Sequence, residues 1–163
     1  KQAHAALEDR KVVPASLELE KAAGAPAAAM ELDDGRVITG KTSDLLGASS
    51  ALLLNVLKEL AGIDHAVHVI SPDAIHPIQE LKTNYLGSKN PRLHMDETMI
   101  ALSISAATNP DARLALEQIP KLKGCQAHTS VILPQAWHRT HLRTEIRAGE
   151  ETAVRQSRWL SVI

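Results

Sequence analysis

Aromatic residues are scarce in this sequence: they make up only 2% of its 163 residues, and phenylalanine is absent. The core must therefore be built from alanine, leucine, isoleucine and valine, each of which buries less apolar area than an aromatic ring. The hydrophobic content of 44% is nevertheless that of a globular chain. The length suffices for one domain with a core of its own.

Other shortages exclude whole classes of protein. Cys125 is the single cysteine, so no internal disulfide can form, and a reducing compartment is favoured. No apolar run approaches the length of a membrane span, and the first ten residues lack the apolar segment of a signal peptide. The formal charge of -1 gives no overall field toward nucleic acid or an anionic membrane. We therefore expect a cytoplasmic protein that uses no cofactor.

Apolar periodicity and turn signals predict short strands that alternate with helices. Strands separated by helices need crossovers, so at least part of the sheet is expected to be parallel. The predicted class is α/β, with a mixed sheet of about four strands, an N-terminal β-hairpin plus crossover strands, covered by Ala/Leu-rich helices. The expected elements are helices over 10–23, 45–61, 72–86, 98–108 and 110–119, and strands over 27–32, 36–40, 65–70 and 126–133.

Composition divides the chain into three parts. Residues 1–24 are predicted to be a helical lead-in, 25–135 the α/β domain, and 136–163 a tail of different character. All nine lysines precede Gly124, whereas five of the nine arginines and both tryptophans follow it. An Arg-rich helix is predicted in the tail, around 146–160.

The string from Gly35 to Thr42 satisfies the Walker A pattern. Its interior holds Val37 and Ile38, whose β-branched side chains favour extended structure over a flexible phosphate-binding loop. The preceding carboxylate of Asp34 would repel phosphate, and Asp-Gly is a strong hairpin signal. We interpret the string as a hairpin, with a nucleotide-binding loop as the alternative.

A weaker anion site is predicted where the second strand passes into a helix. Lys41, Thr42 and Ser43 lie at this position, and in open α/β sheets ligands gather at the carboxyl ends of strands. Ser71 and Asp73 follow the next predicted strand and would share the same edge. The alternative is that Thr42 or Ser43 merely caps the helix.

The densest polar cluster in the sequence precedes the helix predicted over 98–108. Arg92 and His94 stand there beside Asp96 and Glu97, a combination that general acid–base chemistry or anion binding can use. In the alternative interpretation Asp96 caps the helix and Glu97 complements its dipole.

Two further patterns only resemble functional sites. The run Gly47–Ala51 is faintly similar to a nucleophile elbow, but no strand precedes it directly, so close helix packing explains it better. Cys125 and His128, followed by His138 and His141, have zinc-like spacing. Residues three apart in a strand point to opposite faces, so no metal is expected, and Cys125 is predicted to be a small core residue.

Several stretches carry a resemblance to a known bacterial family. From Lys1 to about Gln135 the chain resembles the C-terminal domain of the family known as domain of unknown function 1846. The matching stretches are Asp9–Val13, Gly40–Asn55, Asn90–His94, Ala101–Pro110 and Leu116–Leu122.

The resemblance implies that this chain is the C-terminal part of a longer, two-domain cytoplasmic protein. It also implies that the glycine-rich phosphate loop of such proteins lies in the N-terminal domain. No catalytic residue can be carried over, because the family has no established activity. The sequence past Gln135 departs from the family, and a change of reading frame there is one hypothesis for the tail.

Three functions remain open from the sequence. The first is an accessory domain that supplies one wall of a site for a small anionic or phosphorylated ligand, the missing N-terminal domain supplying the other. The second is a nucleotide-dependent enzyme that uses Gly35 to Thr42. The third is a structural or homo-oligomeric domain, because small-residue helix faces pack as readily against a copy as against a sheet.

Overall fold

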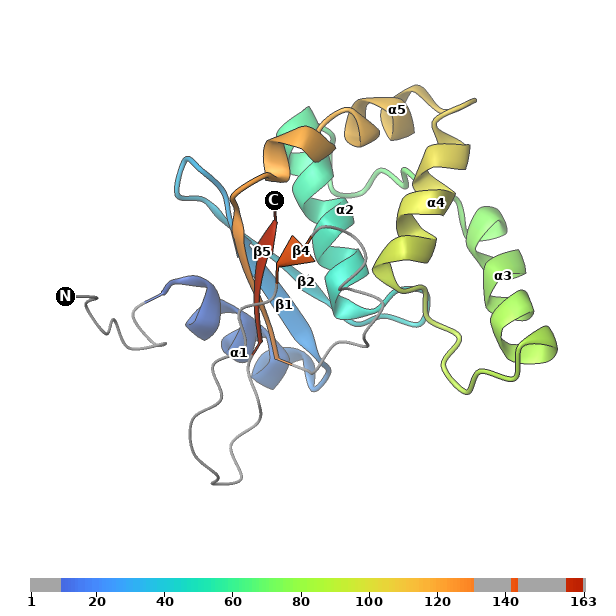
Figure 1. Cartoon of the computed structure of the whole chain (residues 1–163), viewed down its shortest axis with the longest axis horizontal. Helices are drawn as coiled ribbons and strands as arrows, with labels where there is room; N and C mark the ends of the chain where they lie inside the picture. The colour runs from blue at the N-terminus through green and yellow to red at the C-terminus, as the bar shows by residue number, and fades with distance from the viewer. Residues whose placement is uncertain (1–9, 131–141, 144–157, 163) are drawn as a thin grey trace.

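The computed structural model describes residues 10–130, 142–143 and 158–162, and shows a sheet with helices on both faces (Figure 1). In chain order the elements are α1 (Val12–Ala23), β1 (Ala27–Glu31), β2 (Val37–Lys41), α2 (Ala48–Ala61), α3 (Pro72–Glu80), the π-helix η2 (Leu81–Tyr85), α4 (Met95–Ser105), α5 (Pro110–Leu116), the 3-10 helix η3 (Ile119–Leu122), β3 (Gln126–Thr129), β4 (Leu142–Arg143) and β5 (Arg158–Val162).

The strands form one sheet in the order β2-β1-β3-β5-β4. The predicted α/β class and the sheet of about four strands are confirmed. The predicted parallel pairing is wrong, because every described pair of strands is antiparallel. After β2 the chain makes a long helical excursion and returns on the other side of β1, antiparallel to it.

The strand predicted over 65–70 is absent, and the segment forms turns and bends. Lys58 from α2 donates from Nζ to the carbonyls of His65 (2.7 Å) and Val67 (3.3 Å). These backbone acceptors are therefore satisfied by a side chain instead of a neighbouring strand. The apolar end of the segment, with Ile70 only 4% exposed, fills the core as a loop, so burial alone produced the strand-like pattern.

Each face of the sheet is covered by different helices. On β1, Ala28 and Met30 belong to the main apolar cluster, together with Ala127 of β3 and most of α2. Ala29 pairs with His128, so these two residues lie on the opposite face, against which α1 packs. Small residues on both faces of β1 let the helices of both layers approach closely.

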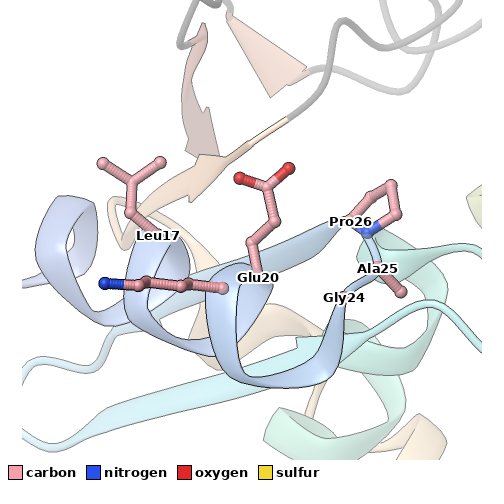
Figure 2. Close-up of a pocket in the computed structure, with 6 residues that line it drawn as sticks. Leu17, Glu20, Gly24, Ala25 and Pro26 are labelled. Atoms are coloured by element: carbon pink, nitrogen blue, oxygen red, sulfur yellow. The ribbon is translucent and has the colours of Figure 1, made fainter.

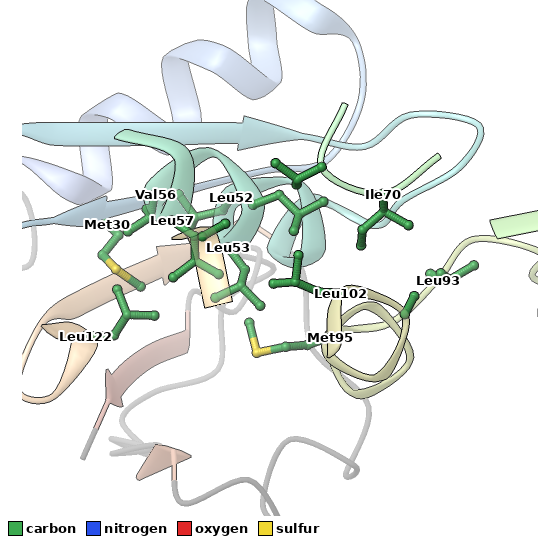
Figure 3. Packing of buried hydrophobic residues seen from close by; sticks show 14 of the residues in the cluster. Met30, Leu52, Leu53, Val56, Leu57, Ile70, Leu93, Met95, Leu102 and Leu122 are labelled. Atoms are coloured by element: carbon green, nitrogen blue, oxygen red, sulfur yellow. The ribbon is translucent and has the colours of Figure 1, made fainter. Parts of the chain in front are cut away.

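The main core lies between the sheet and α2, whose leucines and valine follow helical spacing as predicted (Figure 3). Val56 and Leu57 are fully buried, and Leu53 faces Leu102 and Met95 of α4. Helices α4 and α5 pack against the far side of α2, and α3 packs against α4. The core of this aromatic-poor chain is thus filled by aliphatic side chains of the sheet and of α2, α4 and α5.

The helix ends carry residues that favour helix termination or capping. Gly24 and Gly62 end α1 and α2 in the left-handed conformation, with φ of 63° and 69°. Ser71 and Asn109 cap α3 and α5, accepting from backbone N–H groups with their side chains. The tail helix predicted around 146–160 falls mostly outside the described residues, and residues 158–160 belong to strand β5.

Among the residues that the structure describes, no helix has the length and apolar character needed to cross a membrane.

Candidate functional site

The Walker A-like string forms a hairpin, as predicted. Gly35 adopts a φ of 84° in the turn, and its N–H donates to the carbonyl of Leu32. The N–H of Leu32 donates to the carbonyl of Arg36, and β2 then pairs with β1 along its whole length. The string is therefore a turn followed by a paired strand and does not form the loop between a strand and a helix in which a P-loop holds phosphate.

The second glycine of the string has a packing role. A Cβ at Gly40 would lie 2.2 Å from the backbone nitrogen of Leu52 and 2.8 Å from the carbonyl carbon of Ala51. Because β2 packs this tightly on α2, glycine is needed here for helix–strand contact. Both glycines of the motif thus have structural reasons that involve no nucleotide.

Lys41 and Thr42 do not assemble with the other predicted site residues. Gly40 faces α2, so Lys41, the next residue along the strand, points toward the opposite face, which α1 covers. Thr42 donates both its N–H and its hydroxyl to the carbonyl of Pro26, at 2.9 and 3.0 Å. Thr42 therefore closes the end of the hairpin.

Ser43 and Arg92 are brought together on two adjacent loops, and His94 stands two residues after Arg92 at the start of α4. Arg92 Nε donates to the carbonyl oxygen of Ser43 at 2.6 Å. The loops are joined next to this contact by a parallel bridge between Leu46 and Leu93. The Ser43 hydroxyl accepts from two N–H groups of its own turn, so Ser43 shapes the loop while Arg92 is held by one nitrogen.

The guanidinium of Arg92 keeps two further donor nitrogens, Nη1 and Nη2. Within the part of the chain that the structure describes, neither has a hydrogen-bond or ion-pair partner. An arginine fixed through Nε presents these two nitrogens as a fork, which matches the geometry of a carboxylate or phosphate.

Lys82 belongs to this cluster and was missed in the sequence. It is 6% exposed on η2, and its Nζ donates to the carbonyl of Arg92 (2.6 Å) and to Glu97 Oε2 (2.8 Å). The sequence did indicate that Lys82 is buried. It follows Ile75 and Ile78 at spacings of seven and four, and it therefore lies on the apolar face of the predicted helix. The π-helix that carries it is a rare element, often found at functional sites.

His94 and Glu97 flank the start of α4. The carboxylate of Glu97 accepts from the backbone N–H of His94 at 2.8 Å and so caps the helix. The predicted cap at Asp96 is wrong, because His94 is the N-cap residue and Asp96 lies within the first turn of α4. Burial lowers the pKa of the His94 imidazole, and the nearby charge of Lys82 lowers it further. At neutral pH His94 is therefore a neutral imidazole that can donate and accept hydrogen bonds.

The run Gly47–Ala51 forms the start of α2, in agreement with the close-packing interpretation. Ser50 donates to the carbonyl of Leu93 at 3.0 Å and fixes α2 to the Arg92 loop. The hydroxyl of Ser49 is buried and has no hydrogen-bond partner among the described residues.

Ser71 and Asp73 lie away from this cluster, at the start of α3. Gln79, near the other end of α3, contacts the carbonyl of Asp44 beside Ser43. A helix rises 1.5 Å per residue, so Asp73 stands about 9 Å along the axis from Gln79. The shared strand edge predicted for Ser71 and Asp73 does not exist, because the strand before them is absent.

The cysteine and histidine pattern gives no metal cluster within the described residues. Cys125 is buried as predicted, and burial raises the pKa of its thiol. His128 is fully buried with Ser16 on the α1 face of the sheet. His138 and His141 lie outside the described residues.

A depression of about 460 Å³ lies beside α1 and the turn that follows it (Figure 2). Its lining includes Leu17, Glu20, Lys21 and Pro26. No side chain predicted for the anion site lines this depression, so it does not coincide with the Arg92 cluster.

Comparison with known proteins gives relatives of unknown function. The chain is 60% identical over 132 residues to the UPF0371 protein CE2832 of Corynebacterium efficiens, covering 81% of this chain and 27% of that protein. It is 48% identical over 128 residues to the UPF0371 protein SUB1165 of Streptococcus uberis, covering 78% and 26%. This chain thus spans about a quarter of the length of the curated relatives that it matches.

The sequence profile described as "Domain of unknown function DUF1846, C-terminal" matches residues 8–158. This match extends beyond Gln135, where the resemblance was expected to end, while a change of reading frame in the tail stays a prediction. The match covers most of the chain, which therefore belongs to the family of DUF1846 C-terminal domains.

Proposed function

We propose that this chain is an accessory domain that contributes one wall of a binding site for a small anionic or phosphorylated ligand. The rest of the polypeptide present in its relatives would supply the other wall. The observation that carries the proposal is the Arg92 guanidinium, held at 2.6 Å by the carbonyl of Ser43 with two donor nitrogens left for a ligand.

The surroundings of Arg92 support this role because they fix its position. The Nζ of Lys82 donates to the backbone carbonyl of Arg92, and the carboxylate of Glu97 forms an ion pair with Lys82. Leu93, the next residue, accepts from both Gly47 and Ser50 at the start of α2. A preorganised arginine loses little entropy when it binds a ligand, which favours anion recognition over a freely moving side chain.

His94 adds a neutral partner at the same loop. Its lowered pKa keeps it uncharged at neutral pH, so it can hydrogen-bond a hydroxyl or a protonated phosphate oxygen. The wall thus combines one fixed cation with one neutral imidazole, a combination that suits binding without requiring chemistry at this domain.

The test is a titration with inorganic phosphate and pyrophosphate, monitored by thermal shift. It is made on this chain and on a chimaera in which the chain replaces the matching C-terminal segment of the C. efficiens protein. Arg92→Ala should weaken binding at least tenfold. Arg113→Ala is the matched control, because Arg113 Nε also donates to a carbonyl, that of Ala106, but lies on α5.

The outcomes separate this proposal from the alternatives. Binding lost equally in Arg92→Ala and Arg113→Ala would indicate nonspecific charge, and unchanged binding in Arg92→Ala would refute the proposal. Binding of Mg-ATP that is lost in Lys41→Ala but kept in Arg92→Ala would favour the nucleotide-dependent enzyme instead. Saturating ligand at about 100 times its Kd stabilises the folded state by about 2.7 kcal/mol, a readily measured shift.

A further inference from the structure

Most of the exposed apolar side chains in the described residues gather on two neighbouring elements. The described part of the chain has seven exposed large hydrophobic residues, and five of them lie on α4, on η2 or directly after η2. We name this group the α4–η2 face; its members are Leu81, Tyr85, Leu86, Ile100 and Ile104. Single exposed apolar residues are normal, but a contiguous group marks an interaction surface.

An ion pair joins η2 to α4, the two elements that carry the exposed apolar side chains. Lys82 of η2 and Glu97 of α4 are 2.8 Å apart. Ile100 and Ile104 follow Glu97 at spacings of three and seven, so all three lie on one stripe of α4. Tyr85, 76% exposed, ends η2, the element that carries Lys82. The ion pair therefore joins the two elements that carry the exposed apolar groups.

We infer that the α4–η2 face is the docking surface for the polypeptide that precedes this domain in its relatives. The matched profile is that of a C-terminal domain, and this chain covers only 27% of the C. efficiens protein. Interfaces between domains of one chain commonly bury 600–1,500 Å², which an apolar face on two helical elements can supply in part.

This inference deepens the proposed function, because it places the second wall of the site. The buried Lys82 joins the two elements of this face through Glu97 and donates to the carbonyl of Arg92. A polypeptide seated on the α4–η2 face would therefore stand next to the Arg92 fork. The binding of phosphate and the docking of the polypeptide are nevertheless separate measurements, so one can fail without the other.

Cysteine labelling tests the surface directly. Ile104→Cys is placed in this chain and in the chimaera with the C. efficiens protein, and its rate of reaction with a maleimide is measured. The native Cys125 is buried with a raised pKa, so its background reaction is slow. Leu17→Cys is the matched control, because Leu17 is 40% exposed on α1, away from the face.

We expect Ile104→Cys to react at least tenfold more slowly in the chimaera than in this chain, with Leu17→Cys unchanged. Equal rates for Ile104→Cys in both contexts would overturn the inference. Slowing that depends on the concentration of this chain alone would also overturn it, because a second copy would then cover the face.

A second measurement avoids any failure of the chimaera to fold. Hydroxyl-radical footprinting of the intact C. efficiens protein compares the peptides that align with η2 and α4 with the peptide that aligns with α1. Protection of the first two supports the docking surface, and oxidation at the rate of the α1 peptide contradicts it.

Discussion

Ser16 and His128 lie 112 positions apart in the sequence and are joined by a contact of 2.6 Å between the serine Oγ and the imidazole Nδ1. The serine hydroxyl donates its single proton to the carbonyl of Val13. The hydroxyl therefore accepts from His128, which places the proton of the neutral ring on Nδ1. Both side chains are fully buried, so the pair ties α1 to β3 and is not a nucleophile with its base.

The first prediction is how much the contact between Ser16 and His128 contributes to the free energy of unfolding. Ser16→Ala should lower the free energy of unfolding by about 1–3 kcal/mol, because it leaves the buried Nδ1–H group without its acceptor. Urea denaturation measures the change. Ser103→Ala on the exposed side of α4 is the control and should stay within about 0.5 kcal/mol of the parent chain. An equal stability of both variants would show that α1 is not held by this contact.

The same histidine predicts a pH dependence of stability. Burial lowers the pKa of His128 below its ordinary value near 6.5. As the pH falls through about 6.5 the unfolded chain takes up a proton there, while the folded chain does not until its lower pKa is reached. The unfolded state thus binds more protons in this window, and the free energy of unfolding falls as the pH falls.

The measurement is urea denaturation between pH 8 and pH 5.5. One such group contributes a slope of at most about 1.4 kcal/mol per pH unit. His94, whose pKa is also lowered by burial, adds to the slope in the same direction. His128→Gln should reduce the slope and leave the part due to His94; a slope that stays the same would contradict the assignment to His128.

Local signals in the sequence predicted the helices and the hairpin well. Gly24, Gly62, Ser71 and Asn109 act within one turn of their own backbone, and each of them begins or ends a helix in the structure. The Asp34-Gly35 turn is equally local. Such interactions depend only on neighbours in the sequence, so they can be inferred without knowledge of the tertiary fold.

Tertiary contacts explain what the sequence did not predict. The strand expected over 65–70 fails because Lys58 binds its carbonyls, and no pattern in the segment itself reveals that partner. Lys82 was overlooked because its ion pair with Glu97 spans 15 positions. Arg92 and His94 were recognised by the density of polar residues. Ser43 was grouped with Lys41, but Lys41 is the last residue of β2, whereas Ser43 lies in the loop beyond the strand, where its carbonyl accepts from Arg92.

The ion pair of Lys82 and Glu97 predicts an unequal response to substitution. Lys82 is almost fully buried, whereas the side chain of Glu97 is 29% exposed. Glu97→Ala leaves the buried ammonium group of Lys82 without its counter-charge and removes the carboxylate that caps α4 at His94. It should therefore destabilise the fold by about 2–4 kcal/mol. Lys82→Met leaves only a carboxylate that water can reach, so it should cost less. A double-mutant cycle in urea measures both, and the reverse order would contradict the burial argument.

Two adjacent serines at the start of α2 should behave oppositely. Ser50→Ala removes a buried hydrogen bond to the carbonyl of Leu93 and should cost about 1 kcal/mol. Ser49→Ala removes a buried hydroxyl that has no partner among the described residues, so it should be neutral or stabilising. Thermal unfolding of the two variants compares them directly. A clear loss of stability in Ser49→Ala would show that its hydroxyl has a partner outside the described residues.

Gly40 provides the sharpest test of whether the Walker A-like string is structural. A methyl group there would meet the backbone of α2 at 2.2 Å, which no side-chain movement can relieve. Gly40→Ala should therefore lower the free energy of unfolding by about 3 kcal/mol or more. Gly35→Ala should cost only about 1–2 kcal/mol, from the left-handed conformation, because its nearest neighbour is the flexible end of Lys11. In a phosphate loop both variants would instead keep the fold and lose nucleotide binding. A Gly40→Ala protein with unchanged urea midpoint would therefore exclude the packing role of this glycine and reopen the nucleotide interpretation.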